Sequence, residues 1–206
     1  MRILITAGGT REYIDPVRFI SNASSGKMGY ALAEAALVAG HKVILISASD
    51  LQPPIGIDFV GVESAEDMFN AVKKFFNRCD CLIMAAAVAD YTPARPAKSK
   101  LKKSGKPITL KLKPTADILK WAGSHKKGKQ IVVGFALEDK TLRIRADKKM
   151  KEKNLDMIIA NAPGAIGATK STVLIKAREG NWKEIAKATK SIIAGYVIRQ
   201  AENLLR

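Results

Sequence analysis

The chain begins MRILITAGG (residues 1–9), an apolar run that ends in two glycines and is typical of a first buried strand. Similar runs, rich in Val, Ile, Leu and Ala and lacking polar alternation, recur at 42–47, 58–62, 81–86, 130–136 and 157–160. Such runs indicate strands that are covered on both faces. Helical stretches separate them. The alternation predicts an α/β fold: a Rossmann-like, mainly parallel sheet with helices on both faces.

The ends of these elements carry recognisable signals. A helix is expected over Gly26–Ala39, ended by Gly40 as its C′ residue. Ser64 opens another with a capping-box-like start. Thr115 is expected to cap the helix that contains Asp117. A charged amphipathic helix is predicted over Lys140–Lys153. At the end of the chain, 172–176 and 182–185 predict a β-hairpin before a C-terminal helix.

Composition limits the class of protein. The 206 residues, 47% hydrophobic, suit one globular domain, residues 1–206. No apolar run approaches the roughly 20 residues that span a bilayer, and the N-terminal run is too short for a secretory signal. Cys79 and Cys81 lie too close together to link distant segments, so we expect them to be small core residues. These features predict a cytosolic protein that is not embedded in a membrane.

Two connections are longer than an α/β fold needs. Ala7–Ser25 joins the first strand to its helix, and Ala87–Pro114 follows the fourth strand. Long connections in compact domains are often binding loops. Both begin at strand C-termini, where open parallel sheets bind their ligands. The functional site is therefore expected at this edge of the sheet.

Positive charge is concentrated beside this expected site. The net charge is +16, and Arg95–Lys113 holds eight basic residues and no acidic one. A second concentration covers Lys140–Lys153. Most of these side chains are expected to form a solvated face. An excess of positive charge nevertheless suits nucleic acid, a membrane surface or a strongly anionic small substrate.

The first long connection has features of an anion-binding loop. Its glycines allow close backbone approach, and its serines and bare N–H groups lie at a helix start, which suits an anion. It lacks the G-x-G-x-x-G of dinucleotide-binding proteins and the Walker A pattern. The candidate residues of this loop are Gly8, Gly9, Ser24, Ser25, Gly26 and Lys27.

A longer stretch resembles a known family. Asp15–Gly29 reads DPVRFISNASSGKMG and matches, at nearly every position, the signature of the phosphopantothenate–cysteine ligases. The resemblance continues through 85–91 (AAAVADY), 100–103 (KLKK), 133–136 (VGFA) and 153–156 (KNLD). It keeps the family's order over almost the full length. The family's fold is Rossmann-like, in agreement with the apolar pattern.

The resemblance implies a two-stage ligation. The carboxylate of 4'-phosphopantothenate attacks the α-phosphate of a nucleotide, releasing pyrophosphate and forming an acyl-nucleotide. The amine of L-cysteine then attacks the activated carbonyl. Bacterial members, which this chain resembles, use CTP, and eukaryotic members use ATP. Mg²⁺ is expected with the nucleotide, through metal ligands that the sequence does not identify.

Site residues follow from the same resemblance. Lys100 matches the family's mobile-loop lysine and is expected to be catalytic; its competing interpretation is one solvated lysine among eight. Asn22 is expected to serve the acyl-nucleotide stage, although it could instead cap a loop. Lys149 and Lys153, four residues apart on one helical face, are expected to bind the nucleotide's phosphates. The other positions implied to contact the nucleotide are Met84, Ala85, Ala86, Asp90, Ala116, Asp117, Ile118, Leu119 and Phe135.

The chain also departs from the family pattern. Thr115-Ala116-Asp117 stands where many relatives have Asn-Pro-Asp, which leaves Asp117 in register. Residues 166–171 lack an acidic residue that relatives carry, so no site role is assigned there. The resemblance includes no part of the flavin-dependent decarboxylase domain that is often fused upstream. We therefore expect ligation only, with a possible separate decarboxylase protein as partner or a longer parent chain. Relatives are homodimers, and a homodimer is expected here.

Two other classes compete with the ligase. A nicotinamide-dependent reductase should have a tight glycine turn and an acidic residue after the second strand, where this chain has Ser47-Ala48-Ser49. A nucleic-acid-binding module should interleave aromatic residues with its basic ones, and Arg95–Lys113 contains no aromatic residue. Both are weaker predictions than the ligase.

Overall fold

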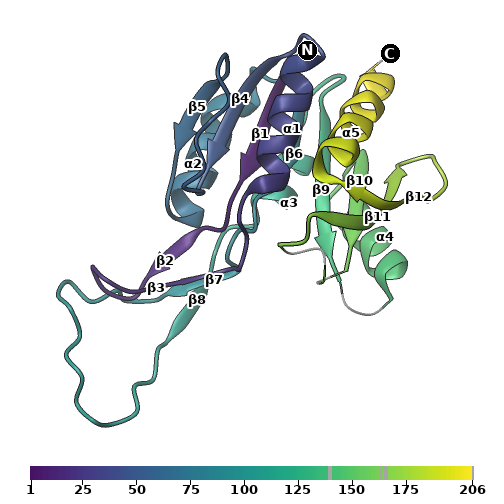
Figure 1. The fold of residues 1–206 in the computed structure, drawn as a ribbon. Helices are drawn as coiled ribbons and strands as arrows, with labels where there is room; N and C mark the ends of the chain where they lie inside the picture. Colours follow the sequence, from purple (N-terminus) through teal and green to yellow (C-terminus); the bar gives the residue numbers. More distant parts are fainter. Residues whose placement is uncertain (139–140, 163, 165–166, 206) are drawn as a thin grey trace.

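An eight-stranded sheet runs through the molecule, which a computed structural model describes at residues 1–138, 141–162, 164 and 167–205 (Figure 1). Its spatial order is β12-β11-β10-β9-β6-β1-β4-β5. Six strands of this sheet pair in parallel, and in chain order they are β1 (Arg2–Ala7), β4 (Lys42–Ser47), β5 (Asp58–Gly61), β6 (Cys81–Met84), β9 (Ile131–Leu137) and β10 (Met157–Asn161). They lie in the 3-2-1-4-5-6 order of the Rossmann fold. The predicted fold class is confirmed.

Helices cover both faces of this sheet, as the apolar runs predicted. On one face lie α1 (Lys27–Val38) and α5 (Lys190–Leu205), and on the other α2 (Ala65–Phe76), α3 (Ile118–His125) and α4 (Leu142–Glu152). In β1, Ile3 and Ile5 pack toward α1 and α5 while Leu4 packs toward α2 and α3. Because neighbouring side chains of a strand enter opposite cores, both must be apolar.

Two of the three predicted helix signals are confirmed. Ser64 and Asp67 form a reciprocal capping box at the start of α2. Gly40, with φ +78°, follows the end of α1. The assignment of Thr115 as a cap is wrong: its hydroxyl donates to the carbonyl of Ala89 at 2.6 Å. Asp117 caps α3 instead, accepting from the amide of Lys120 at 2.9 Å.

The C-terminal hairpin is also confirmed. It consists of β11 (Lys170–Ala177) and β12 (Lys183–Thr189), antiparallel to each other, with β11 antiparallel to β10. Trp182 precedes the second strand. The helix predicted over Lys140–Lys153 is α4, although Lys140 lies outside the described residues. No helix in the described part of the chain is both long and apolar enough to cross a membrane.

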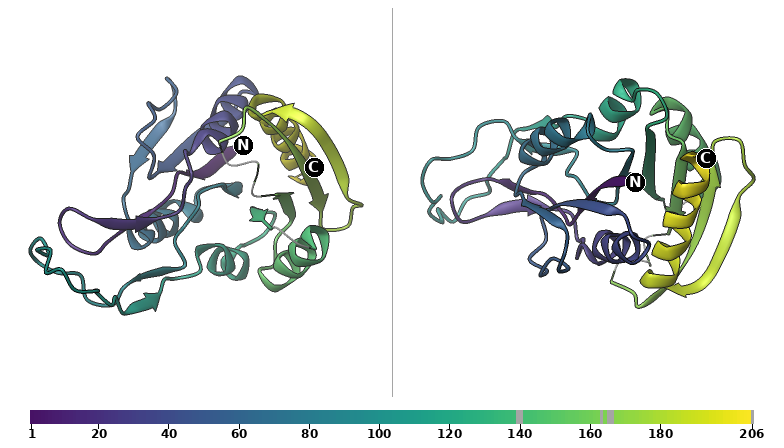
Figure 2. Two further views of the ribbon diagram at one scale, coloured as in Figure 1. Left: turned by 60° about the horizontal axis from the view of Figure 1, so that its bottom comes forward. Right: turned by 90° about the horizontal axis from the view of Figure 1, so that it is seen from above.

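Both long connections contain a hairpin that the sequence did not predict. The first holds β2 (Arg11–Tyr13) and β3 (Phe19–Ser21), and the second holds β7 (Tyr91–Pro93) and β8 (Leu112–Pro114). The two hairpins lie side by side and project from the sheet (Figures 1 and 2). We call these hairpins, with the loop 94–111 between β7 and β8, the arm.

Candidate active site

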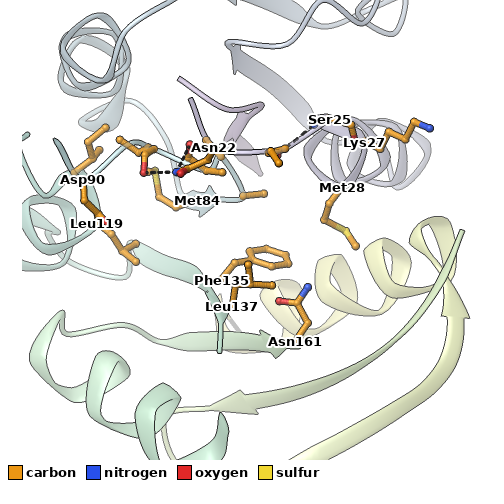
Figure 3. A pocket seen from close by; sticks show the side chains of 18 of the residues that line it. Asn22, Ser25, Lys27, Met28, Met84, Asp90, Leu119, Phe135, Leu137 and Asn161 are labelled. Carbon is orange, nitrogen blue, oxygen red and sulfur yellow. Dashed lines mark hydrogen bonds between the residues drawn. The ribbon is translucent and has the colours of Figure 1, made fainter. Parts of the chain in front are cut away.

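A cavity of about 680 Å³ opens at the carboxyl end of the parallel strands. It lies where the strand order reverses between β1 and β6, the switch point at which open α/β sheets bind ligands. Figure 3 shows side chains from both halves of the sheet facing this space. Its walls come from the loop before α1, the loop after β6, the start of α3, β9, α4 and the C-terminal hairpin.

Most of the predicted site residues line this one cavity. From the first loop these are Asn22, Ser24, Ser25, Gly26 and Lys27, and from the expected nucleotide site they are Met84, Ala85, Ala86, Asp90, Ala116, Asp117, Ile118, Leu119, Phe135, Lys149 and Lys153. The strand β6 ends at Met84, two residues earlier than predicted, so Ala85 and Ala86 belong to the loop. The end of the Lys27 side chain points away from the cavity centre (Figure 3).

Gly8 and Gly9, also predicted for the site, are not among the residues that line this cavity. A Cβ atom on Gly8 would lie 2.6 Å from the backbone nitrogen of Ser49, and one on Gly9 would lie 2.6 Å from the carbonyl oxygen of Asn22. Gly8 also has a φ of +85°, which side chains disfavour. Its carbonyl accepts from the amide of Ala87 at 2.8 Å. The two glycines therefore allow the loops after β1, β4 and β6 to pack closely.

Asn22 connects two walls of the cavity. Its side-chain nitrogen donates to the carbonyls of Ala87 at 3.2 Å and Val88 at 3.1 Å. An amide has two N–H donors, and here both are used. Donation to an oxyanion would therefore have to replace one of these bonds. The side chain also holds the loop after β6 in place, in keeping with the structural role that the sequence left open.

Two lysines line the opposite wall. Lys149 donates to the carbonyl of Phe135 at 2.8 Å, and Lys153 pairs with Asp117 at 2.8 Å. Burial, reinforced by the nearby charge of Lys153, lowers the pKa of Lys149. Burial raises the pKa of Asp117, but the hydrogen bonds from Lys153 and Lys120 outweigh it and the net shift is downward. This wall can attract a polyanion.

The cavity offers little to a metal ion on its own. Asp90 and Asp117 are the carboxylates that line it in the described part of the chain. The described part of the chain contains no group of three or more His, Cys, Asp or Glu side chains arranged to hold a metal ion. Mg²⁺ is commonly held by one or two carboxylates together with substrate phosphates. The donors present fit a magnesium ion that arrives with a nucleotide.

Lys100 is a predicted site residue that does not line this cavity. It is exposed in the loop 94–111 of the arm. Its neighbour Leu101 is bound at the turn of the β2–β3 hairpin. The sequence predicted that Lys100 lies beside the nucleotide, whereas in the structure it lies on the arm, which projects from the sheet.

The cavity also has a wall to which the sequence assigned no role. Asn161, Gly167, Ser171, Val173 and Lys190 come from the end of β10, the following connection, β11 and the start of α5. Lys190 donates to the carbonyl of Ala168 at 2.5 Å. These residues carry no recognisable motif, because they meet only when the C-terminal hairpin returns over the sheet. Ile166, in the departing stretch, lies outside the described residues.

Comparisons with known proteins agree with this geometry. Residues 1–204 match the family model described as DNA/pantothenate metabolism flavoprotein C-terminal domain. The chain is 46% identical over 204 residues to the coenzyme A biosynthesis bifunctional protein CoaBC of Bacillus subtilis, covering 96% of this chain and 50% of that protein. It is 36% identical to CoaBC of Vibrio vulnificus, covering 98% of this chain and 52% of that protein. The chain thus spans about half the length of these curated relatives.

Solved structures give the same result. The crystal structure of the C-terminal domain of CoaBC matches with a TM-score of 0.85 and 42% identity, covering 99% of this chain and 95% of that one. A mutant of Cab2, solved in complex with phosphopantothenate-cysteine, shares the fold at a TM-score of 0.81 and 18% identity, covering 99% of this chain and 87% of that one. The chain belongs to the family of DNA/pantothenate metabolism flavoprotein C-terminal domains.

Proposed function

We propose that this chain is a phosphopantothenate–cysteine ligase, acting in coenzyme A biosynthesis as a single domain over residues 1–206. The observation that carries the proposal is the cavity at the switch point. It brings together Asn22, Asp90, Phe135 and the lysines of α4, which are far apart in sequence and match the ligase pattern. The 46% identity to a protein named for coenzyme A biosynthesis supports the same activity.

In the first stage, a carboxylate oxygen of 4'-phosphopantothenate attacks the α-phosphorus of the nucleotide. An O–P bond forms, the bond to the bridging oxygen breaks, and pyrophosphate leaves. Several negative charges approach one another, so positive charge and N–H donors are needed more than a general base. Lys149 and Lys153 supply charge from one wall, and the start of α1, which lacks a side-chain cap, presents N–H groups from the other.

In the second stage, the amine of L-cysteine attacks the acyl carbonyl. A C–N bond forms, the amine loses a proton, and the nucleoside monophosphate leaves. Esterification to phosphate is essential, because a free carboxylate would have to expel oxide. We assign this stage to Asn22, whose amide lies between the loop before α1 and the loop after β6.

We infer that CTP is the preferred nucleotide, because the stretch Ala85–Tyr91 and the Lys100–Lys103 run resemble the bacterial form. Mg²⁺ accompanies the triphosphate and neutralises part of its charge. Asp90 and Asp117 are the residues available to hold the ion. Neither nucleic acid nor a membrane is expected as a partner. A separate decarboxylase protein is the class of partner that would supply or consume intermediates of the same biosynthesis.

We also propose a homodimer that forms through the arm. Six large apolar side chains are at least 39% exposed on it: Val17, Phe19, Tyr91, Ile108, Leu110 and Leu112. A concentration of exposed apolar residues on one projection is typical of a protein–protein interface.

Cys79 and Cys81 are free thiols, the state that a reducing compartment maintains, and this favours the cytoplasm.

A nucleotide panel tests the activity. Purified protein is mixed with 4'-phosphopantothenate, L-cysteine, Mg²⁺ and either CTP or ATP, and pyrophosphate release is followed with mass spectrometry of the product. We expect cysteine-dependent formation of phosphopantothenoylcysteine, faster with CTP. Lys149→Gln should lose most activity, whereas Lys129→Gln, at an exposed position outside the cavity, should not. Equal or faster turnover with ATP would contradict the nucleotide choice, and no product with either would contradict the ligase.

A further inference from the structure

The turn of the β2–β3 hairpin contains a buried carboxylate. The side chain of Asp15 has 0% exposure and accepts from the amides of Val17 and Arg18, each at 2.9 Å. It also accepts from Nε of Arg18 at 3.0 Å and from the same guanidinium through Nη2. A buried charge persists only where it is paired and hydrogen-bonded. Arg18 holds the pKa of Asp15 well below its usual range, so the carboxylate stays ionised.

The Asp15–Arg18 pair also binds the main chain of Leu101, which lies in the loop 94–111 of the arm. The amide of Leu101 donates to Oδ2 of Asp15 at 3.1 Å, and Nη2 of Arg18 donates to the carbonyl of Leu101 at 2.6 Å. Both polar main-chain groups of Leu101 are thus bound by one ion pair, across more than 80 residues of sequence. Nearby, the amide of Ala97 donates to the carbonyl of Ile14 at 2.8 Å.

This contact holds the last partly buried residue of the loop 94–111 before a long exposed stretch. Leu101 is partly buried, whereas the chain from Lys102 to Pro114 is exposed throughout. Lys100, the proposed catalytic lysine, is the residue directly before Leu101. A side chain on an untethered loop would have to be ordered at each turnover, with an entropic cost that slows the reaction. A fixed main chain one residue away removes much of that cost.

We propose that Asp15 and Arg18 form a clamp on the main chain of Leu101 that positions Lys100 for acyl-nucleotide formation. Asp15 is a positioning residue, because it acts through the loop and does not line the cavity. The inference rests on the proposed ligase function for its effect on rate. The clamp itself can be tested without activity.

The sharpest variant changes the clamped main chain alone. Leu101→Pro removes the N–H that Asp15 accepts and leaves both clamp side chains intact. Leu101→Val, of similar size, keeps the N–H and is the matched control. We expect Leu101→Pro to slow acyl-nucleotide formation by about 10²-fold, the effect of a small misplacement of a reacting group. Nucleotide affinity and the midpoint of thermal unfolding should match those of Leu101→Val. Equal single-turnover rates for the two variants would overturn the proposal.

Proline also restricts Lys100, so a second variant leaves the loop unchanged. In Asp15→Asn the carboxylate that binds Leu101 and Arg18 is lost. We expect trypsin to cut after Lys100, Lys102 and Lys103 faster than in wild type. Unchanged proteolysis would overturn the clamp. A wild type that forms no acyl-nucleotide but shows the proteolysis difference would instead count against the proposed function alone.

Discussion

At the scale of single residues, Lys149 is a partly buried lysine that lies beside a second positive charge in the cavity wall. Burial and the neighbouring Lys153 favour its neutral form, whereas a bound triphosphate would favour the charged form. Nucleotide binding should therefore be coupled to proton uptake at Lys149. Because its pKa is lowered, the protonated form is lost as pH rises, at a lower pH than for an exposed lysine. Affinity should fall over that range.

Calorimetry can measure this coupling. Titration with CTP in two buffers of different ionisation enthalpy, at pH values where the triphosphate is fully ionised, reports the protons taken up. We expect uptake in wild type and almost none in Lys149→Arg, since a guanidinium remains charged throughout. The affinity of that variant should also change less with pH. An identical pH dependence in both proteins would assign the effect to another group.

Asn22 and Lys100 should separate the two half-reactions. Lys100 is assigned to the stage at which charge builds around the α-phosphate, so Lys100→Gln should abolish acyl-nucleotide formation. Asn22→Asp cannot donate to Ala87, Val88 or an oxyanion, and should slow cysteine attack by about 10²–10³-fold. Quenched reactions analysed by mass spectrometry should then contain acyl-cytidylate only in Asn22→Asp. Its accumulation in Lys100→Gln would reverse the assignment.

The sequence could predict a site residue where a motif carried it. Asn22, Asp90 and Lys149 lie in stretches that match the ligase pattern, and each lines the cavity. Ser171 and Lys190 line it too, yet they are isolated polar residues whose position depends on how β11 and α5 return to the sheet. No local pattern encodes that return. The location of Lys100 depends in the same way on a contact with Asp15 across the arm.

At the scale of elements, Asp117 joins helix α3 to the phosphate-binding wall. It caps the helix through Lys120 and pairs with Lys153. Asp117→Ala should remove both contacts and lower the free energy of unfolding by about 1 kcal/mol, the usual cost of a lost cap. Asp117→Asn should lose less, because asparagine is an equally good cap.

Urea unfolding measures the free energy of unfolding of both Asp117 variants. The control is Glu34→Ala, a substitution at an exposed position of α1. The folded pKa of Asp117 is lowered, so its charge stabilises the fold above the unfolded pKa. That contribution is lost as pH falls through the folded value. The difference between wild type and Asp117→Asn should therefore shrink in acid. A difference that grows in acid would contradict the ion pair.

The elements themselves were predictable to different degrees. Strands β1, β4 and β10 are buried on both faces, so their sequences are continuous apolar runs that indicate a strand directly. The hairpins of the arm gave no such signal. Arg11–Tyr13 and Tyr91–Pro93 are three residues long, partly exposed and mixed in polarity. They are held by pairing with a neighbouring strand, which depends on tertiary contacts.

At the scale of the whole molecule, the arm separates the two proposed catalytic residues. Asn22 lines the cavity, whereas Lys100 is anchored at the turn of the β2–β3 hairpin, on a projection from the sheet (Figure 1). The exposed apolar residues of the arm favour a second copy as its partner. In a symmetric dimer of this kind, each arm would extend toward the partner subunit. We therefore predict that Lys100 acts in the partner's cavity.

Complementation between two inactive chains tests this arrangement. Asn22→Asp and Lys100→Gln chains are co-expressed with different tags, and the mixed dimer is purified through both. If Lys100 acts across the dimer, one cavity receives Asn22 from one chain and Lys100 from the other, while its counterpart receives neither. The mixed dimer should then regain about half of the wild-type turnover, because one of its two symmetry-related sites is intact. Each variant alone should remain inactive. If Lys100 served its own chain, both cavities of the mixed dimer would carry one defect and no activity would return. A mixed dimer that also carries Phe19→Asp tests the interface, because this change places a charge on the exposed apolar surface of the arm. If that dimer still regains turnover, dimerisation through the arm is not required.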